Sequence, residues 1–341
     1  MAISRILAVR NDRFGEFLLT VPALYELKQV FPKARLTLVV SSYVRTLAGR
    51  LAFVDEVIVW EKKKHTFAGF LRLAKEYKGR HYDLCVIFNP CKAFNIISFL
   101  AGIPLRVGYN RKWGFLLNRK IEDRKFEGLK HEVEYNLELL KTIGITPKLL
   151  NNASLRVRSE ATDEAVLMEI REEDFSDSKL SELGLSKGEF AVIHPWSSNK
   201  EKEWPQDRFK ELVVKIADNL GLKCAVIGGS EEVSRAIEFC RDLPACLSSR
   251  QMVNLAGKTS LIESAALLKK SKLLITNDSG PMHLAAAAGT PVAAIFRKSP
   301  PAVNSRRWGP VGNNHVVIEN DIISNITVAE VLDGIKKILT K

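Results

Sequence analysis

One turn between an apolar segment and an alanine-rich segment carries the most informative side chains of the chain. Leu273–Thr276 is typical of a buried strand, and a helical pattern begins directly after the Asn-Asp-Ser-Gly that follows it. Asp278 or Ser279 can cap that helix. The backbone N–H groups and positive helix end at Ser279 and Gly280 suit a diphosphate, and His283 can add a donor. The alternative is that Asp278 only caps a structural helix and His283 packs inside.

Two further turns of the second half also follow strand-like segments. The first, His194–Pro205, contains serines and lysines that could hold phosphate oxygens, with lysine acting as a point charge. A solvated charged loop is the alternative. The second, Ile227–Glu232, is a strand-to-helix turn whose carboxylates could accept hydrogen bonds from ribose hydroxyls.

A turn near the N-terminus places two carboxylates where they could act as a general base. Val9–Leu18 reads as strand, tight turn and helix, and it contains Asp12 and Glu16. It lacks G-x-G-x-x-G, so a dinucleotide fold is not indicated. The alternative is that Glu16 is a favourable acid in the first turn of a helix.

The stretch Arg106–Lys130 is basic and rich in aromatic residues. It holds eight basic and three acidic side chains, with Trp113, Phe115 and Phe126 among them. This composition suits a phosphorylated, sugar-bearing lipid and equally a single-stranded nucleic acid. A plain solvated surface is the third interpretation. H-E-x-x-H, the P-loop and D-x-D are all absent from the sequence, so neither a catalytic zinc nor a metal-bound nucleotide is signalled.

The elements that must position these residues alternate along the chain between apolar runs and amphipathic stretches. This order predicts parallel sheets covered by helices, repeated in two halves. The expected strands are 6–10, 35–41, 55–60, 83–88, 190–194, 223–227, 272–276 and 291–296. The expected helices are 17–31, 206–219, 231–241, 261–270, 282–288 and 327–339. Because Pro22 lacks an N–H, it fits the helix 17–31 only near a first turn or at a kink. Ligands of such sheets bind at the carboxyl ends of the strands, where all these turns lie.

The bulk properties agree with a soluble two-domain protein that attracts anions. The chain has 341 residues and a formal net charge of +12, which predicts attraction to nucleic acid, a membrane surface, a phosphorylated lipid or a nucleotide sugar. The polar, acidic stretch 151–187 is the natural region between two domains. The N-terminus shows neither a signal peptide nor a membrane span. The five cysteines lack C-x-x-C spacing and several lie in apolar runs, which predicts reduced thiols in the cytoplasm.

Several dispersed motifs, in order, resemble glycosyltransferase family 9, the ADP-heptose-dependent heptosyltransferases. They are Arg10-x-Asp12-x-x-Gly15-Glu16-x-x-Leu19-Thr20-x-Pro22, His194 through Trp204-Pro205, Ile227-Gly228-Gly229, Leu255 through Ser260, and Asp278 through Ala285. The resemblance spans nearly the whole chain. It implies a GT-B architecture of two Rossmann-like domains facing a cleft: residues 1–165 on the acceptor side, 166–325 binding the nucleotide sugar, and a C-terminal helix, 326–341, that returns to the first domain.

The same resemblance implies roles for individual residues. The diphosphate would be held by Ser197, Ser198, Lys202, Ser279, Gly280 and His283, the nucleoside by Asp278 and Glu232, and the adenine would be bordered by Lys258, Thr259 and Ser260. Glu16 or Asp12 would be the base, and the acceptor would be bound by Arg106, Arg111, Lys112, Arg119 and Lys120. Two departures stand out. Gly15-Glu16 replaces the usual Gly-Asp, and Phe296-Arg297-Lys298-Ser299 replaces the usual Phe-Gly-Pro-Thr.

The reaction implied is an inverting, metal-independent transfer of heptose from ADP-heptose to the lipopolysaccharide inner core, with no cofactor. The implied partners are the nucleotide sugar, a phosphorylated core or lipid A acceptor and an anionic membrane, with no nucleic acid. The enzyme would be a monomer, peripheral on the cytoplasmic face of the inner membrane. A sugar-nucleotide epimerase of the same fold and a basic nucleic-acid-binding protein are the alternatives. The first is disfavoured because Pro281-Met282-His283 stands where such epimerases carry Gly-Gly and acidic residues.

Overall fold

The chain folds into two compact α/β units. The computed structural model describes residues 2–61, 66–148, 169–243 and 251–340. The first unit comprises the described residues up to Glu169, and the second those from Ile170 onward. The predicted boundary at residues 165–166 lies outside the described residues.

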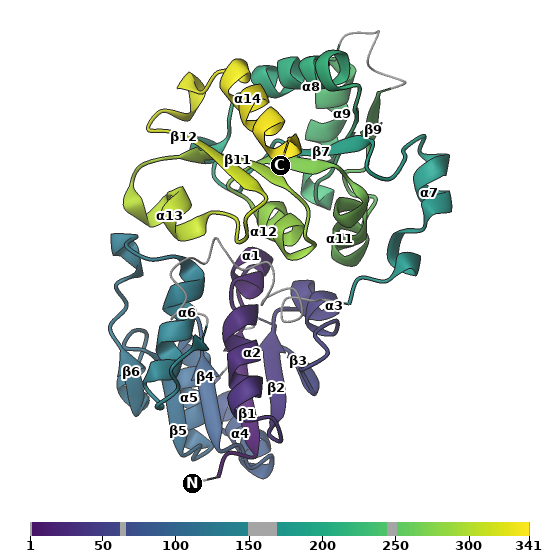
Figure 1. The fold of residues 1–341 in the computed structure, drawn as a ribbon. Helices are drawn as coiled ribbons and strands as arrows, with labels where there is room; N and C mark the ends of the chain where they lie inside the picture. The colour runs from purple at the N-terminus through teal and green to yellow at the C-terminus, as the bar shows by residue number, and fades with distance from the viewer. Residues whose placement is uncertain (1, 62–65, 149–168, 244–250, 341) are drawn as a thin grey trace. The chain divides into compact units, whose positions relative to one another are not determined.

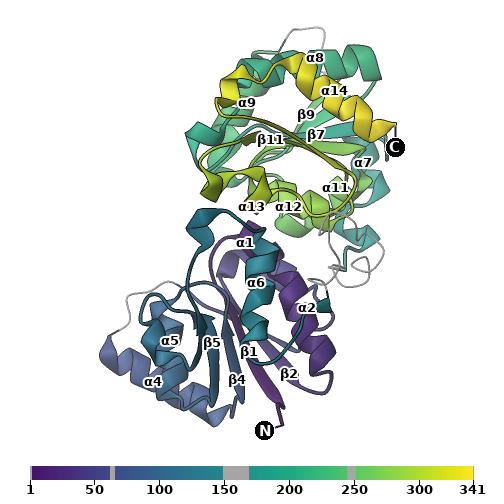
Figure 2. The same cartoon turned by 60° about the vertical axis from the view of Figure 1, so that its left-hand side comes forward.

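The first unit is a parallel sheet whose strand order is β3-β2-β1-β4-β5-β6 (Figure 1). The strands are β1 (Arg5–Arg10), β2 (Arg35–Val40), β3 (Glu56–Val59), β4 (Leu84–Ile87), β5 (Leu105–Tyr109) and β6 (Arg119–Ile121). The helices are α1 (Phe14–Leu18), α2 (Val21–Val30), α3 (Arg45–Ala48), α4 (Phe67–Gly79), α5 (Lys92–Leu100) and α6 (Glu132–Lys141). Figure 2 shows α4 and α5 on one face of the sheet and α2 and α6 on the other. The central strands are thus covered on both faces, which explains why Ile6–Val9 is apolar without interruption.

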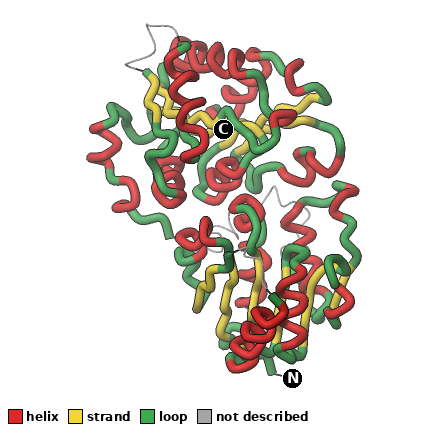
Figure 3. Tube along the Cα trace, turned by 180° about the vertical axis from the view of Figure 1, so that it is seen from behind, coloured by secondary structure: helices red, strands yellow, loops and turns green. Residues whose placement is uncertain are grey.

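The second unit repeats this topology with the order β12-β11-β10-β7-β8-β9. The strands are β7 (Phe190–His194), β8 (Lys223–Val226), β9 (Met252–Asn254), β10 (Leu273–Asn277), β11 (Val292–Arg297) and β12 (His315–Asn320). The helices are α7 (Asp177–Glu182), α8 (Gln206–Leu220), α9 (Val233–Arg241), α11 (Leu261–Lys270), α12 (Gly280–Ala287), α13 (Ser305–Trp308) and α14 (Val328–Leu339). Seen from behind, each unit is a layer of strands between layers of helices (Figure 3). Counted within each unit, both sheets have the order 3-2-1-4-5-6, so the prediction of two Rossmann-like domains is confirmed.

The predicted helix 17–31 is divided in the structure. It forms α1 and α2, separated at Leu19 and Thr20, and Pro22 lies in the first turn of α2. The Thr20 hydroxyl donates to the Glu16 carbonyl at the break. The proline position was predicted correctly, but it ends one helix and begins another instead of kinking a single one.

The C-terminal helix packs within the second unit. The apolar face of α14 is buried in the core of the second unit, with Val331, Leu332 and Ile335 among the buried residues. Its neighbours there are α8, β11 and β12. The sequence showed correctly that the helix has one apolar face, which contributes to the core of the second unit. The return of this helix to the first domain stays a prediction.

The acidic stretch expected between the domains belongs to the second unit in its described part. Lys270 of α11 forms ion pairs with Glu172 and Asp177, and Lys179 pairs with Glu263 at 2.7 Å. Phe175 is buried among these residues. The acidic side chains therefore dock this segment on α11.

Candidate active site

The second sheet brings two of the predicted turns together. Its strand order reverses between β7 and β10, which pair in parallel with Thr276 beside His194. Ligands of open α/β sheets bind at the carboxyl edge, at such a reversal. The loop after His194 and the turn after Asn277 begin side by side at this point.

The start of α12 has no side-chain cap from its N-cap residue. Ser279 is the N-cap residue by its extended backbone, but its side chain does not accept from the first turn of the helix. Its hydroxyl lies instead 2.9 Å from the Thr276 hydroxyl and 3.2 Å from His194 Nδ1. The capping predicted for Ser279 is therefore not made, because a neighbouring hydroxyl and imidazole take its side chain. Backbone N–H groups at such an uncapped helix start suit an anionic ligand.

The loop after β7 lies directly against this turn. Lys202 Nζ lies 2.5 Å from Asp278 Oδ2, and the Ser197 hydroxyl donates to the Asp278 carbonyl at 3.1 Å. Ser198 is exposed beside them, and His283 is buried in the first turn of α12. The structure thus gathers the residues predicted for the diphosphate at one place. It also pairs Lys202 with Asp278, two residues that were assigned to different parts of the ligand.

Three residues that sequence reasoning missed fix the shape of this loop. The Glu203 carboxylate accepts from the Ser197 N–H at 3.0 Å and from both terminal nitrogens of Arg235, at 3.1 and 2.7 Å. The Asn277 side chain accepts from the Trp204 N–H at 2.9 Å and donates to a carbonyl of the same loop. Such bidentate contacts define geometry well. Asn277 and Glu203 lie within the quoted motifs, but their partners depend on a register that the sequence does not display.

Glu232 lies on the next strand-end turn, after β8. Its carboxylate accepts from the Gly229 N–H at 2.8 Å, and His194 Nε2 lies 3.6 Å away. Burial alone would raise the pKa of Glu232, but the contacts with His194 and Gly229 outweigh it and lower the pKa below its usual value. A Cβ at Gly228 would lie 2.8 Å from both the Glu232 carboxylate and the Trp196 ring, so this close packing requires glycine. Glu232 is therefore held ionised beside the carboxyl edge.

The predicted adenine border, Lys258–Ser260, follows β9 and lies near the Glu232 turn. The Gly257 N–H donates to the Gly228 carbonyl at 2.9 Å, which joins the two turns. The Ser260 hydroxyl caps α11, the Thr259 hydroxyl contacts Ser264, and the Lys258 ammonium donates to a backbone carbonyl. These three side chains already have partners within the protein. Their position near the Glu232 turn agrees with the predicted adenine border, but a direct contact with the adenine stays a prediction.

Arg297, where the sequence departs from the usual family motif, contacts the loop that follows β7. Arg297 ends β11, the strand beside β10, and its guanidinium lies 2.9 Å from the Glu201 carboxylate. Glu201 is next in sequence to Lys202, and its side chain is 72% exposed. The departure therefore adds an exposed ion pair beside the Lys202 loop, and such pairs contribute little to stability.

The first sheet has its own reversal, between β1 and β4, and a buried cation stands there. Arg10 ends β1 with 2% exposure and donates to Asp12 at 2.8 Å and to the Phe88 carbonyl at 3.3 Å. Glu132 lies 3.7 Å from the Arg10 guanidinium and pairs with Lys125 at 2.6 Å. Burial alone would lower the pKa of Arg10, and the two carboxylates reverse that effect. A buried charge of this kind requires such partners, so Asp12 has a clear structural task.

The two candidate bases differ in their surroundings. Asp12 accepts a charged hydrogen bond from Arg10, whereas Glu16 lies half-buried in the first turn of α1. Burial, and next the nearby Asp12 carboxylate, raise the pKa of Glu16. A carboxylate with a raised pKa is a better proton acceptor, and perturbed values of this kind cluster at functional sites. Of the two predicted bases, Asp12 is thus engaged by Arg10, whereas Glu16 has the raised pKa.

The predicted acceptor residues do not gather at one place. Arg106 lies at the amino end of β5, where its guanidinium donates to the Leu116 and Ile103 carbonyls and stacks on the Phe99 ring. Burial lowers the pKa of Arg106, which fits a structural cation. Arg119 and Lys120 are exposed on the edge strand β6. Arg111 and Lys112 follow the carboxyl end of β5 and are exposed.

The loop after β5 presents exposed aromatic rings. Lys112 and Trp113 have left-handed backbone angles, with φ of 49° and 72°, and the buried Asn95 amide donates to the Lys112 carbonyl at 3.0 Å. Trp113 is 47% and Phe115 67% exposed, and Lys92 lies over the Trp113 ring. Strained backbone held by a buried side chain is a frequent mark of function.

The four cysteines in the described ranges are free thiols, and no helix in those ranges is long and apolar enough to cross a membrane.

Two Rossmann-like units, each with polar side chains gathered at its carboxyl edge, form a GT-B architecture. The model of glycosyltransferase family 9 (heptosyltransferase) matches residues 70–332, and the chain belongs to this family. Lipopolysaccharide heptosyltransferase 3 of Escherichia coli K12 is 26% identical over 337 residues, covering 96% of this chain and 91% of the relative.

Solved structures confirm the fold. That of E. coli ADP-heptose lipopolysaccharide heptosyltransferase II superposes with a TM-score of 0.78, at 22% identity and with 98% of each chain covered. E. coli heptosyltransferase WaaC with ADP gives a TM-score of 0.74, at 22% identity, covering 98% of this chain and 99% of that one. With the family match, the chain is a glycosyltransferase, and the epimerase alternative keeps only its similarity of fold.

Proposed function

We propose that this enzyme transfers heptose from ADP-heptose to the inner core of lipopolysaccharide, with inversion and without a metal ion. The observation that carries the proposal is the start of α12, where the Ser279 side chain makes no cap and Lys202, Ser197 and Asp278 lie at hydrogen-bonding distances around the preceding turn. The relatives are named as lipopolysaccharide heptosyltransferases, and one neighbouring structure contains ADP.

The donor half of the reaction uses fixed positive charge. As the bond from the anomeric carbon to the diphosphate breaks, negative charge grows on the leaving ADP. Backbone N–H groups at the start of α12 and the Lys202 ammonium stabilise that charge, which is the task a metal ion performs in other transferases. Lys202 is already oriented by Asp278, so little reorganisation is needed when the donor binds.

The acceptor half requires a proton acceptor. The attacking hydroxyl loses its proton as it forms the new bond to the anomeric carbon, and Glu16 takes that proton. Attack from the side opposite the leaving diphosphate inverts the anomeric configuration in one step. Asp12 keeps the buried Arg10 neutralised and raises the pKa of Glu16, so it assists without receiving the proton.

The acceptor and its membrane are bound by the first unit. Arg111, Lys112, Arg119 and Lys120 are exposed cations suited to core or lipid A phosphates, and Trp113 and Phe115 suit the interfacial region of a bilayer. We leave Arg106 out of this set because backbone carbonyls occupy its guanidinium. We further propose that the enzyme works as a monomer, peripheral on the cytoplasmic face of the inner membrane, and without a cofactor.

Calorimetric titration with ADP and ADP-heptose in EDTA tests the donor assignment. Both ligands should bind the whole chain with the same affinity as in magnesium. Strict dependence on magnesium would reject the metal-free mechanism. The anomeric configuration of the product, read by NMR, tests inversion, and a product of retained configuration would reject the single displacement.

A further inference from the structure

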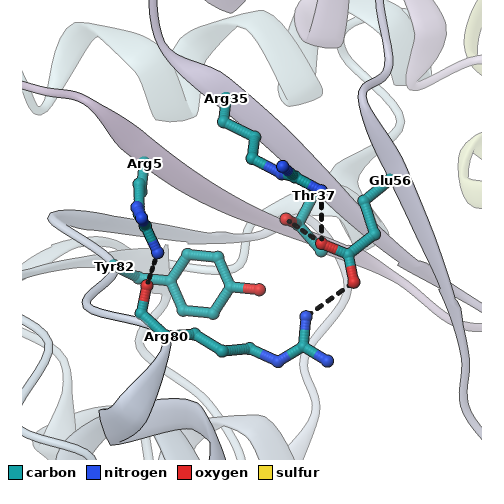
Figure 4. Close-up of a pocket in the computed structure, with 6 residues that line it drawn as sticks. All are labelled: Arg5, Arg35, Thr37, Glu56, Arg80 and Tyr82. Atoms are coloured by element: carbon teal, nitrogen blue, oxygen red, sulfur yellow. Dashed lines mark hydrogen bonds and ion pairs between the residues drawn. The ribbon is translucent and has the colours of Figure 1, made fainter.

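A cavity of about 280 Å³ lies at the amino edge of the first sheet, at the opposite end of β1 from Arg10. It is lined by Arg5, Arg35, Thr37, Glu56, Arg80 and Tyr82 (Figure 4). Five residue steps along β1 separate its Arg5 from Arg10, which is roughly 16 Å at strand spacing. The cavity is therefore distinct from the carboxyl edges that serve the transfer reaction.

The strand pattern explains why charged side chains line this cavity. Arg5 pairs with Arg35, and Thr37 pairs with Glu56, so these four side chains lie on the same face of adjacent strands. Further along β1, the same face carries the buried Leu7 and Val9. The amino ends of three strands thus place polar groups where the core face would otherwise be apolar. Arg80 and Tyr82, between α4 and β4, complete the lining.

Three arginines and one carboxylate line the cavity. Glu56 lies 2.6 Å from Arg80 and 3.5 Å from Arg35, and it is the single carboxylate among the six lining residues. The Arg5 guanidinium donates to the Arg80 carbonyl, and the Arg5 backbone N–H donates to the Asp83 carboxylate at 2.9 Å. The Arg35 side chain is 61% exposed, and its contact with Glu56 is long. Glu76 also pairs with Arg80, at 3.6 Å, so Arg35, with its long contact and high exposure, is the lining arginine most available to a ligand.

The floor of the cavity offers groups that bind hydroxyls. Tyr82 is 6% exposed, and its hydroxyl points into the space between the arginines (Figure 4). That hydroxyl makes no well-formed hydrogen bond within the described part of the chain, although Thr37 and Arg80 face it. A buried hydroxyl without a hydrogen-bond partner destabilises the fold, and a ligand that hydrogen-bonds to it removes that penalty. The Thr37 hydroxyl and the Glu56 carboxylate lie 3.4 Å apart on the same floor.

We propose that this cavity binds a small soluble sugar phosphate, with the phosphate at Arg5 and Arg35 and the sugar hydroxyls at Glu56, Thr37 and Tyr82. Guanidinium groups recognise phosphate oxygens in pairs, and a carboxylate accepts from sugar hydroxyls but repels a bare phosphate. The volume suits a ligand of this size and lies near the lower end for ligand pockets. The site is independent of the proposed donor site.

Calorimetric titration of the whole chain with glucose 6-phosphate, inorganic phosphate and glucose tests the proposal. Saturating ADP occupies the donor site, and ionic strength is fixed because surface charge is screened by salt. Glucose 6-phosphate should bind more tightly than either of the other two compounds. Arg35→Gln should weaken its binding at least roughly tenfold, the usual loss for one charged hydrogen bond.

Two further variants separate a built site from general attraction to a basic protein. Arg72→Gln removes an exposed arginine of α4 outside the cavity and should leave the affinity unchanged. Glu56→Gln should strengthen binding of inorganic phosphate and reduce the preference for the sugar phosphate. No binding by the parent chain, or equal losses in Arg35→Gln and Arg72→Gln, would overturn the proposal. The thermal midpoint of each unliganded variant shows that it is folded.

Discussion

The two sheets share one strand order but carry opposite chemistry at their carboxyl edges. In the first unit, the reversal between β1 and β4 holds a buried arginine, Arg10, surrounded by carboxylates, and Glu16 has a raised pKa. In the second, the reversal between β7 and β10 holds the uncapped start of α12 and Lys202, while Glu232 has a lowered pKa. One edge suits proton transfer, and the other suits a diphosphate.

This difference shows that topology selects the place of a site and local sequence selects its chemistry. Both edges lie where ligands bind in open α/β sheets. What differs is the helix that follows each reversal. The five-residue α1 has a glutamate in its first turn, whereas α12 follows Ser279 with Gly-Pro and has no acidic residue in its first turn. A two-substrate transferase needs one edge of each kind, and the predictions below test that division.

The largest effect is expected at Glu16. Glu16→Gln keeps the shape and hydrogen bonding of the side chain but removes its proton affinity, so kcat should fall by roughly 10²–10⁴. Donor affinity should stay nearly constant because the residues proposed to hold the diphosphate belong to the other unit. Steady-state kinetics and calorimetric titration with ADP measure the two quantities. A large loss of ADP affinity would break the division of labour.

Asp12→Asn and Glu16→Asp are the matched controls for this prediction. Asp12→Asn weakens the partner of Arg10, so it should lower the thermal midpoint, which Glu16→Gln should not do. Glu16→Asp restores the residue usual in the family and should keep activity if the backbone of α1 follows the family. An inactive Glu16→Asp with an active Glu16→Gln would show that the carboxylate is structural.

The second largest effect is expected on the binding of the enzyme to an anionic membrane. Reversing Lys112, Arg119 and Lys120 to Glu removes three exposed cations, each worth about 1 kcal/mol near an anionic surface. Binding to anionic vesicles at low salt should fall at least roughly 100-fold, as measured by co-sedimentation. The control reverses Arg72, Lys75 and Lys78, exposed residues of α4 with the same total charge. Equal losses in both variants would mean that net charge alone attracts the vesicles.

The donor edge should respond to Asp278→Ala with a smaller loss. The carboxylate contacts Lys202, and we propose that it also binds the nucleoside, so the affinity for ADP should fall roughly 10- to 100-fold. Asp207→Ala, an exposed aspartate of α8, serves as the control. The double variant with Lys202→Met separates the two tasks. Additive losses would assign Asp278 to the ligand, and a loss absent in the Lys202→Met background would assign it to Lys202.

Much of this architecture could be predicted from the sequence. The central strands of both sheets read as uninterrupted apolar runs because helices cover them on both faces, and Leu261–Lys270 was predicted with its observed bounds. The outer strands β5, β6, β9 and β12 were missed. They are short or half-buried, so residues such as Arg106, Lys120 and Glu319 interrupt their pattern. The apolar face of α14 was predicted correctly, but a pattern of apolar residues does not show which sheet that face packs against.

The site shows the same limit at finer scale. Residue types after strand ends placed Ser197, Lys202 and Asp278 correctly at one edge. The Lys202–Asp278 ion pair joins residues 76 positions apart, and it depends on the register of β7 against β10. The partners of Ser279 were likewise hidden, because His194 and Thr276 meet only when those strands pair. Spacing along the chain thus identifies candidates, while pairing between strands decides which of them are already occupied.

The smallest effect, and the sharpest comparison, is the pH dependence of stability at Glu16 and Glu232. The folded-state pKa of Glu16 is raised, so its favourable contribution is complete below the unfolded pKa, near 4.3, and is lost as pH rises through the folded pKa. Glu16→Gln removes this loss and should raise the thermal midpoint slightly at pH 7.

The folded-state pKa of Glu232 is lowered, so its favourable contribution is present above the unfolded pKa and is lost as pH falls through the folded-state pKa. Glu232→Gln should therefore lower the midpoint at pH 7, and the difference should shrink towards pH 3. Calorimetric scans of both variants and the parent between pH 3 and pH 8 measure the two trends. Shifts of the same sign at pH 7 would show that the two edges do not treat a carboxylate differently, and the assignment of proton transfer to the first unit would lose its physical basis.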